Sequence, residues 1–326
     1  KKLKHLYIKM AKKKIEKKKR KKRSIKLFLA IIGAILFLLI AVFLFSPAPV
    51  EKEIEESLQR ISNADEEFTH LVDQIQLKLD LIDANELLSK EALNQLSKDV
   101  SQLDTYLNLA EEKVNIIKEE TQRIKELDEF GDYSEFIESL EKAYSEFLES
   151  IKNLKKWSSN MHKLIDYLDP SFDLIALSER IEFYEESLTN YLLASDYESA
   201  KNIISKIEEN LNRIKDSLAQ ARKTISFSFD KKQESLTNYY LKYLSELKTA
   251  ISLAQQGKEE EAEKHVQQSL TYYAKITESA PTETEFLNEL DSWKNKNLIP
   301  YAEQADSHFT KGTRYFDKAL DILNAE

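Results

Sequence analysis

The sequence predicts an all-α protein in which one membrane-spanning helix near the N-terminus precedes an elongated, coiled-coil-like bundle of helical hairpins. The first observation is the scarcity of residues that interrupt helices, because the 326 residues include only 4 Gly and 5 Pro. The second is the recurrence of apolar side chains at alternating intervals of three and four, which is typical of helices that pack as coiled coils. The third is one long apolar segment close to the N-terminus.

The membrane-spanning helix is predicted at Leu27–Phe45, where no side chain is charged. At ~1.5 Å per residue this segment reaches roughly 28 Å, close to the thickness of the apolar part of a bilayer. A cleaved signal peptide is the alternative, but a cut within Ser46–Pro49 would place Pro next to the cleaved bond. The sequence therefore favours an uncleaved signal anchor, followed by a Pro-containing linker at residues 46–50.

Charge is distributed unequally on the two sides of the apolar segment. Residues 1–26 carry a net charge of +14, and the remainder carries a net charge of -23. Basic flanks stay in the cytoplasm, so we predict a cytoplasmic tail at 1–26, a location in the cell membrane, and extracytoplasmic residues 46–326. The tail acts either as a topology signal alone or as a binding segment for anionic lipid head groups. Nucleic acid is a disfavoured partner because the basic residues at 9–26 are not interleaved with aromatic or Gly residues. Met10 is a second candidate for the start of translation.

Long coiled-coil-like helices are predicted for residues 51–168. Three apolar seams lie in this region, at Ile54–Ile82, Leu93–Ile124 and Ile137–Leu168. Their spacing of about 3.5 residues places each set of apolar side chains on one helix face. The first seam is interrupted by Asp65.

The first two seams are in phase, which leaves two arrangements open for residues 51–129. One continuous helix would expose a seam that a second copy of the chain would have to cover, and this arrangement predicts a homo-oligomer. A hairpin that turns near Asp83–Ser89 would let the two seams cover each other, with Ser89 as the N-cap of the second helix. The hairpin is the favoured prediction because it buries both seams within one chain.

A bundle of shorter helices is predicted for residues 169–326. Gly131 is expected to end the helix before it, and Asp169-Pro170 is expected to end the third long helix, because proline disfavours helical geometry in the preceding residue. Gly312 is expected to break the last helix. The remaining helices are expected at 173–195, 197–226, 232–256, 258–279, 283–297 and 300–325.

Four segments share a turn pattern in which Gly or Asp closes one helix and Tyr or Ala begins the packing of the next. They are Phe130–Glu135, Ala194–Ala200, Gln256–Ala262 and Lys311–Phe316. The pattern resembles the turn inside tetratricopeptide helical hairpins. Successive turns lie roughly 55–65 residues apart, whereas that family repeats at about 34, so the resemblance implies elongated hairpins with tetratricopeptide-like turns.

Sequence patterns of catalytic and metal sites are missing. The chain has no Cys, no phosphate loop, no dinucleotide fingerprint and no nucleophile elbow. We therefore expect no enzymatic activity and no cofactor. Glu67 and His70 have the spacing found in di-metal carboxylate bundles, but such sites need a second Glu-x-x-His pair, so we interpret the two residues as part of a solvated helix face.

Aromatic residues are the remaining candidates for a binding site. Tyr240 and Tyr243 fall on an apolar seam and are expected to pack in a core, with hydroxyl groups at its edge. Clustered aromatic rings also bind sugars, cations or peptides. Other aromatics occur earlier, at Phe183, Tyr184 and Tyr191, and a motif recurs at 186–191, 234–239 and, more weakly, 269–273. The candidate contacts for a ligand or partner are Tyr239, Tyr243, Tyr272, Tyr273, Trp157 and Trp293.

Two functions are compatible with these features. The leading hypothesis is a membrane-anchored, extracytoplasmic helical scaffold of the cell envelope that binds an unidentified protein. The alternative is an extracytoplasmic ligand-binding or sensory module that acts within a larger membrane complex. A concave site with polar side chains would favour the module, whereas filled seams and broad contact surfaces would favour the scaffold.

Overall fold

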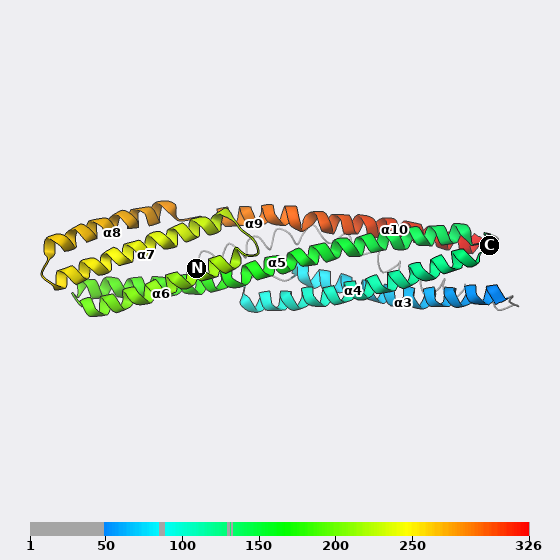
Figure 1. Cartoon of the computed structure of the whole chain (residues 1–326), viewed down its shortest axis with the longest axis horizontal. Helices are drawn as coiled ribbons and strands as arrows, with labels where there is room; N and C mark the ends of the chain where they lie inside the picture. The colour runs from blue at the N-terminus through cyan, green and yellow to red at the C-terminus, as the bar shows by residue number, and fades with distance from the viewer. Residues whose placement is uncertain (1–48, 85–88, 129–130, 132, 326) are drawn as a thin grey trace. The chain divides into compact units, whose positions relative to one another are not determined.

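The structure is a computed structural model that describes residues 49–84, 89–128, 131 and 133–325. These residues form helices joined by short turns, and no strand occurs among them, which confirms the predicted all-α class (Figure 1). The helices are α3 (Pro49–Ala84), α4 (Lys90–Leu127), α5 (Ser134–Leu193), α6 (Tyr197–Ala221), α7 (Ser228–Gln255), α8 (Glu259–Ser279), α9 (Glu283–Asn297) and α10 (Ile299–Ala325).

The predicted membrane segment Leu27–Phe45 and the basic tail lie outside the described residues, as does most of the linker. Within the described part of the chain, no helix combines the length and the apolar character needed to cross a bilayer.

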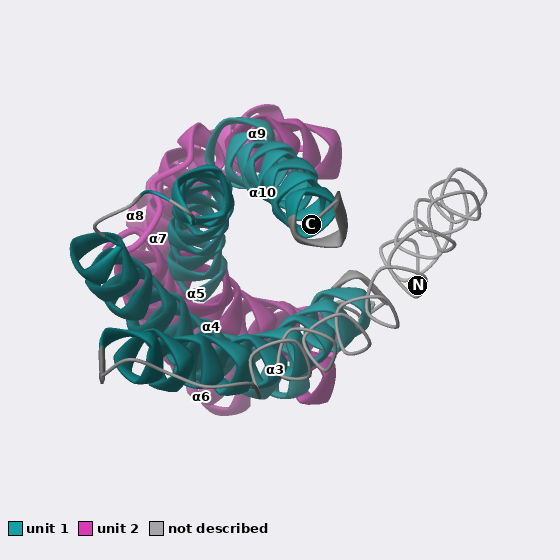
Figure 2. Cartoon of the chain, turned by 90° about the vertical axis from the view of Figure 1, so that its right-hand side faces the viewer, with its two compact units in different colours: residues 1–88, 94–162, 295–326 teal, residues 89–93, 163–294 magenta. Residues whose placement is uncertain are grey.

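Two compact units divide the chain (Figure 2). Unit 1 contains residues 1–88, 94–162 and 295–326, and unit 2 contains residues 89–93 and 163–294. The C-terminal helix α10 therefore belongs with α3, α4 and the first part of α5, whereas the sequence placed it in a separate bundle at 169–326. The apolar pattern of α10 did not reveal which earlier helices it contacts.

Helices α3 and α4 form an antiparallel hairpin, which confirms the favoured arrangement of the first two seams. The turn is capped by Ser89, whose Oγ accepts a hydrogen bond from the N–H of Ala92 at 3.1 Å. Ion pairs join the two helices from end to end, and the residue numbers rise along α3 as they fall along α4. These pairs are Glu53–Arg123 at 3.5 Å, Arg60–Glu120 at 3.0 Å, Glu67–Lys113 at 2.5 Å and Lys78–Asp99 at 2.9 Å.

The core of unit 1 is filled by the predicted seams. In α4, the seam residues from Val100 to Ile117 are fully buried. Asp65, which interrupts the first seam, is also buried, and its Oδ1 accepts a hydrogen bond from the phenol of Tyr144. Burial raises the pKa of Asp65 to about 6, although the Tyr144 hydrogen bond opposes that shift. Its other carboxylate oxygen, Oδ2, is buried without a hydrogen-bond partner.

Pro170 does not end a helix, so the predicted break at Asp169-Pro170 is wrong. Helix α5 runs from Ser134 to Leu193 with Pro170 inside it. A proline within a helix removes one backbone hydrogen bond and costs about 3 kcal/mol or more. The flanking turns are held in place by tertiary packing, since Tyr167, Leu168 and Leu177 are all buried.

Gly312 does not break α10, and the predicted turn at Lys311–Phe316 is therefore wrong. A Cβ atom at Gly312 would lie 2.6 Å from two ring atoms of Phe147 and 3.1 Å from the carbonyl oxygen of Ala143. Glycine is required there by the close approach of two helices rather than by a turn. The other three segments are turns, with positive φ angles at Gly131, Ser195 and Gly257.

Unit 2 has its core between α5, α6 and α7. Helices α6 and α7 are antiparallel and are joined by Arg222–Glu234 at 2.6 Å and by Glu208–Lys248 at 2.9 Å. Helix α8 packs along α7 (Figure 1), but only Ala262 and Ser269 of α8 are buried. The core side chains of this unit come from the three other helices and are Leu177, Ile181, Leu188, Ala200, Ile203, Ile204, Ile207, Leu211, Ile214, Leu218, Leu244 and Ile251.

Candidate functional site

An open groove of about 660 Å³ lies between the C-terminal part of α5 and α6, within unit 2. This volume falls in the range of small-molecule sites in proteins. Residues from both helices form its walls, namely Ala176, Glu179, Arg180, Phe183, Tyr184, Lys206, Glu209, Asn210 and Arg213.

Helical spacing brings these side chains together. On α5, Ala176, Arg180 and Phe183 follow one another at intervals of four and three, so they share one face of the helix. On α6, Lys206 and Arg213 are seven residues apart and share a face in the same way. The other side of α6 carries the row of isoleucines and leucines that fills the core, so burial of that row fixes the groove residues outward.

The groove contains three cations and two carboxylates. The ammonium of Lys206 lies 5.7 Å from the ring centroid of Tyr184, and the backbone carbonyl of Lys206 accepts a hydrogen bond from Nδ2 of Asn210 at 2.7 Å. No carboxylate of the described chain lies within ion-pair distance of Arg180 or Arg213. Two guanidinium groups without ion pairs can bind a small molecule that carries a carboxylate, because their paired N–H groups match its two oxygens.

Phe183 adds apolar surface to this site. Its side chain is 66% exposed, and its ring centroid lies 5.7 Å from that of Tyr184. An exposed ring beside guanidinium groups can pack against the apolar part of a bound molecule while the cations bind its charge.

The predicted tyrosine contacts separate into two groups on the α7–α8 hairpin. In the first group, the ring centroid of Tyr243 lies 5.8 Å from Tyr240 and 5.7 Å from Tyr273. Burial raises the pKa of Tyr243, and the nearby charge of Glu185 on α5 adds to the shift. Burial likewise raises the pKa of Glu185, with a smaller contribution from Glu182. Tyr240 and Tyr243 pack against the core of unit 2, as expected of seam tyrosines. The hydroxyl of Tyr240 does not lie at the edge of the core, because it is buried and has no hydrogen-bond partner among the described residues.

The second group combines Tyr239 and Tyr272 with two lysines. The ammonium of Lys275 lies 5.5 Å from the ring centroid of Tyr239 and 5.7 Å from that of Tyr272. The ammonium of Lys242 lies 5.7 Å from the Tyr272 ring centroid. Cations at this distance are attracted by the electron-rich ring faces.

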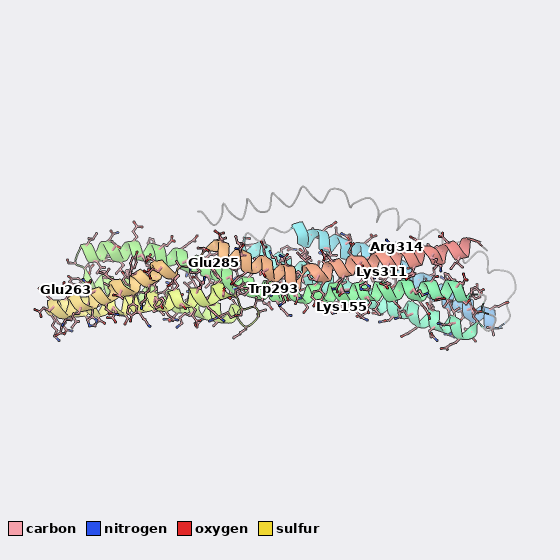
Figure 3. The ribbon with its side chains drawn as sticks, turned by 90° about the horizontal axis from the view of Figure 1, so that it is seen from above. Lys155, Glu263, Glu285, Trp293, Lys311 and Arg314 are labelled. Atoms are coloured by element: carbon pink, nitrogen blue, oxygen red, sulfur yellow. The ribbon has the colours of Figure 1, made fainter. Side chains whose placement is uncertain are left out.

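The two tryptophans lie on other helices. Trp157 is half-buried on α5 in unit 1, and Trp293 is half-buried on α9 in unit 2 (Figure 3). The role of Trp157, Trp293, Tyr239, Tyr243, Tyr272 and Tyr273 in binding a ligand or partner stays a prediction.

The described histidines are held by carboxylates or exposed to solvent. Glu67 pairs with Lys113, and His70 is exposed. The other three described histidines join neighbouring helices as His162–Asp104 at 2.8 Å, His265–Glu246 at 2.6 Å and His308–Glu146 at 2.6 Å. Over residues 49–84, 89–128, 131 and 133–325, no group of three or more His, Cys, Asp or Glu side chains is arranged to hold a metal ion.

Arg180, Lys206 and Arg213 were not among the site residues predicted from the sequence. Their spacing was available as a signal, because each helix places its polar groove residues at intervals of three, four or seven. What the sequence did not show was that these faces of α5 and α6 border one hollow.

Comparison with known proteins gives one match, to residues 147–290. This segment is similar to the protein family described as a four helix bundle sensory module for signal transduction. Such modules are extracytoplasmic parts of membrane receptors, and the match is consistent with a membrane location. No curated protein and no solved structure matches the chain. The matched segment contains the whole α5–α6 groove and the α7–α8 hairpin.

Proposed function

We propose that unit 2 is an extracytoplasmic sensory module that detects a small anionic molecule in the groove between α5 and α6. The observation that carries this proposal is a concave site inside residues 147–290 in which Arg180 and Arg213 form no ion pair with any described residue. The module acts on a protein partner within a membrane complex, to which Leu27–Phe45 anchors the chain.

The electrostatics of the groove support an anion rather than a cation as the ligand. Three cations face two carboxylates, and the guanidinium groups remain charged at every physiological pH. An anion that enters between two guanidinium groups gains charge-assisted hydrogen bonds, which are about twice as strong as those between neutral groups. Because the groove is open to solvent, this attraction should weaken as the salt concentration rises.

The sensory function replaces the scaffold as the leading hypothesis. A scaffold needs broad contact surfaces and filled seams, and unit 1 has filled seams of that kind. A concave site with polar side chains was the feature expected of a ligand-binding module, and unit 2 has such a site. The similarity of residues 147–290 to a sensory module supports the same conclusion.

A binding experiment tests the proposal on the full chain in detergent micelles. Small carboxylates, including dicarboxylates, amino acids and aromatic acids, are screened by thermal shift and then by calorimetry. A true ligand at one hundred times its Kd stabilises the folded protein by about 2.7 kcal/mol. We expect the Arg180→Gln/Arg213→Gln variant to lose this shift, because the two guanidinium groups bind the ligand charge.

The control is Arg314→Gln, which removes one guanidinium group from α10 outside the groove (Figure 3). This variant should bind the ligand as the wild type does. The basic tail also attracts anions. If the wild type and the groove variant bound the ligand equally, binding would be due to the tail and the proposal would be disproved. The absence of any small anion that stabilises the wild type would disprove it as well.

A further inference from the structure

Two segments of the α7–α8 hairpin contain no acidic residues. The chain contains 57 Asp and Glu among 326 residues, yet none occurs in residues 235–245 of α7 or in residues 264–277 of α8. The acids of α8 lie at its start, up to Glu263 (Figure 3), and at Glu278. Acid-free segments of similar length also occur at 150–165, 217–229 and 247–258, so the distinguishing feature of this pair is that its two segments lie on neighbouring helices.

The two acid-free segments lie beside each other. Helices α7 and α8 run side by side in opposite directions (Figure 1). The antiparallel pairing places Tyr239 of α7 next to Lys275 of α8, and Lys242 of α7 next to Tyr272 of α8. We name these four residues the tyrosine–lysine face.

A recurring motif supplies part of this surface. Ser235-Leu-Thr-Asn-Tyr239 on α7 is echoed by Ser269-Leu-Thr-Tyr-Tyr273 on α8, and each copy lies inside an acid-free segment. The motif therefore brings tyrosine and hydroxyl groups to both helices of the hairpin. Asn238 is half-buried and Gln268 is exposed.

The lysines of this face differ from Lys232 and Lys248 of α7. Lys232 and Lys248 form ion pairs, at 2.8 Å with Glu285 and at 2.9 Å with Glu208. Lys242 and Lys275 are exposed, and no carboxylate of the described residues lies within ion-pair distance of either. Each ammonium group lies near an aromatic ring, and both lysines are accessible to solvent.

We infer that the tyrosine–lysine face binds an anionic carbohydrate polymer. The ammonium groups supply the charge that attracts carboxylate or phosphate groups along such a polymer. The half-buried rings of Tyr239 and Tyr272 offer apolar surface and phenol groups to sugar rings. Amide and hydroxyl side chains nearby, such as Gln268, can hydrogen-bond sugar hydroxyls. This inference concerns a site separate from the α5–α6 groove.

The shape of the charge distribution favours a polymer over a membrane surface. Glu259, Glu260 and Glu261 form the first turn of α8, on the same helix as Lys275. A flat anionic bilayer would approach these carboxylates together with the lysines and would be repelled. A linear chain can follow the acid-free part of the hairpin and avoid the acidic turn.

Lysine footprinting on the full chain in detergent micelles tests the inference site by site. The rate of acetylation at each lysine is read by mass spectrometry, so that binding of polyanions to the basic tail does not obscure the result. The probes are alginate, which carries carboxylates, a poly(glycerol phosphate) teichoic acid, which carries phosphates, neutral dextran and poly-glutamate. We expect at least one of the two anionic glycopolymers to slow acetylation of Lys242 and Lys275 at least fivefold, and the arm that does so identifies the anionic group.

Two exposed lysines outside the face, Lys223 and Lys296, serve as internal controls and should be unaffected. The Tyr239→Leu/Tyr272→Leu variant should lose most of the protection while its circular dichroism stays unchanged. Protection should persist in the Arg180→Gln/Arg213→Gln variant, so that failure of the groove proposal and failure of this one are separable.

Three results would overturn the inference. They are the absence of protection by both anionic glycopolymers, equal protection by poly-glutamate, and equal protection of the control lysines. Unchanged protection in the double tyrosine variant would also overturn it, because the rings would then play no part in binding.

Discussion

The two units bury their helices to different degrees. In unit 1, every contributing helix places large side chains in the core, including Phe316 and Leu320 from α10. In unit 2, the core is shared by α5, α6 and α7, and α8 stays outside it with Val266, Leu270 and Tyr273 exposed. A helix that contacts one neighbour keeps more of its surface free, and free surface is what a ligand or polymer needs. The difference explains why the tyrosine–lysine face falls in unit 2, although unit 1 has the more regular seams, whereas the groove lies between two core helices, α5 and α6.

Replacing a leucine by alanine should affect stability very differently in the two units, and this is the largest contrast that we expect. Leu107 of α4 is fully buried, and Leu107→Ala should lower the free energy of unfolding by about 2.7–5 kcal/mol, because it leaves a cavity. Leu270 of α8 is 51% exposed, and Leu270→Ala should cost less than about 1 kcal/mol, since it removes little buried area. Denaturant unfolding of the two variants measures both values. Equal losses would show that α8 is buried in solution and would remove the contrast between the units.

The buried carboxyl group of unit 1 should give that unit a distinctive pH dependence. The pKa of Asp65 is raised from 3.8 to about 6 in the folded state, so the folded state binds more protons than the unfolded state between these values. The contribution of Asp65 to the free energy of unfolding is fully present below pH ~3.8. It is lost as the pH rises through about 6, and the total loss is about 3 kcal/mol. We expect Asp65→Asn to remove this loss.

The measurement is the difference in unfolding free energy between wild type and Asp65→Asn at pH 4 and at pH 8. Taking the difference cancels the contributions of the other titratable groups. Tyr144→Phe provides a second test, because the lost phenol hydrogen bond should raise the pKa of Asp65 further and move the loss of stability to higher pH. An Asn variant with the same pH dependence as wild type would contradict the burial of a titrating carboxyl at this position.

Two glycines should give smaller effects, each for a different reason. Gly312→Ala should cost roughly 1–3 kcal/mol, because its methyl group would overlap the Phe147 ring. Gly257→Ala should cost roughly 1–2 kcal/mol, because the φ angle of +75° disfavours a side chain even though the space is open.

Second substitutions distinguish these two mechanisms by thermal unfolding. Phe147→Leu should recover part of the stability lost in Gly312→Ala, because a smaller side chain makes room for the methyl group. Gly257→Asn should be milder than Gly257→Ala, since Asn tolerates positive φ. If Phe147→Leu lowered the stability of Gly312→Ala by as much as it lowers that of the wild type, steric overlap would be ruled out as the cause.

The repeat of apolar residues predicted most of the fold. The seam from Leu93 to Ile124 is buried as expected, and Ser89 caps α4 as expected. Pro170 and Gly312 were misread because sequence rules describe an isolated helix, whereas packing on neighbouring helices determines the outcome at both positions. The groove was beyond prediction for a related reason. Arg180 and Arg213 each belong to a recognisable helix face, but a concave site depends on which two faces meet.

The α3–α4 hairpin has a further consequence for how the chain selects one alignment. A seam with a seven-residue repeat looks nearly the same after a slip of one repeat, so apolar contacts alone leave several alignments close in energy. A slip of this size would replace Asp65 by Leu58 or Val72 opposite Tyr144, and would bring Asp65 against apolar side chains. Each surface ion pair between the helices contributes little to stability, but all four would be broken by the same slip. Because Asp65 interrupts the first seam at a single position, the correct alignment of the helices differs in energy from an alignment shifted by one repeat.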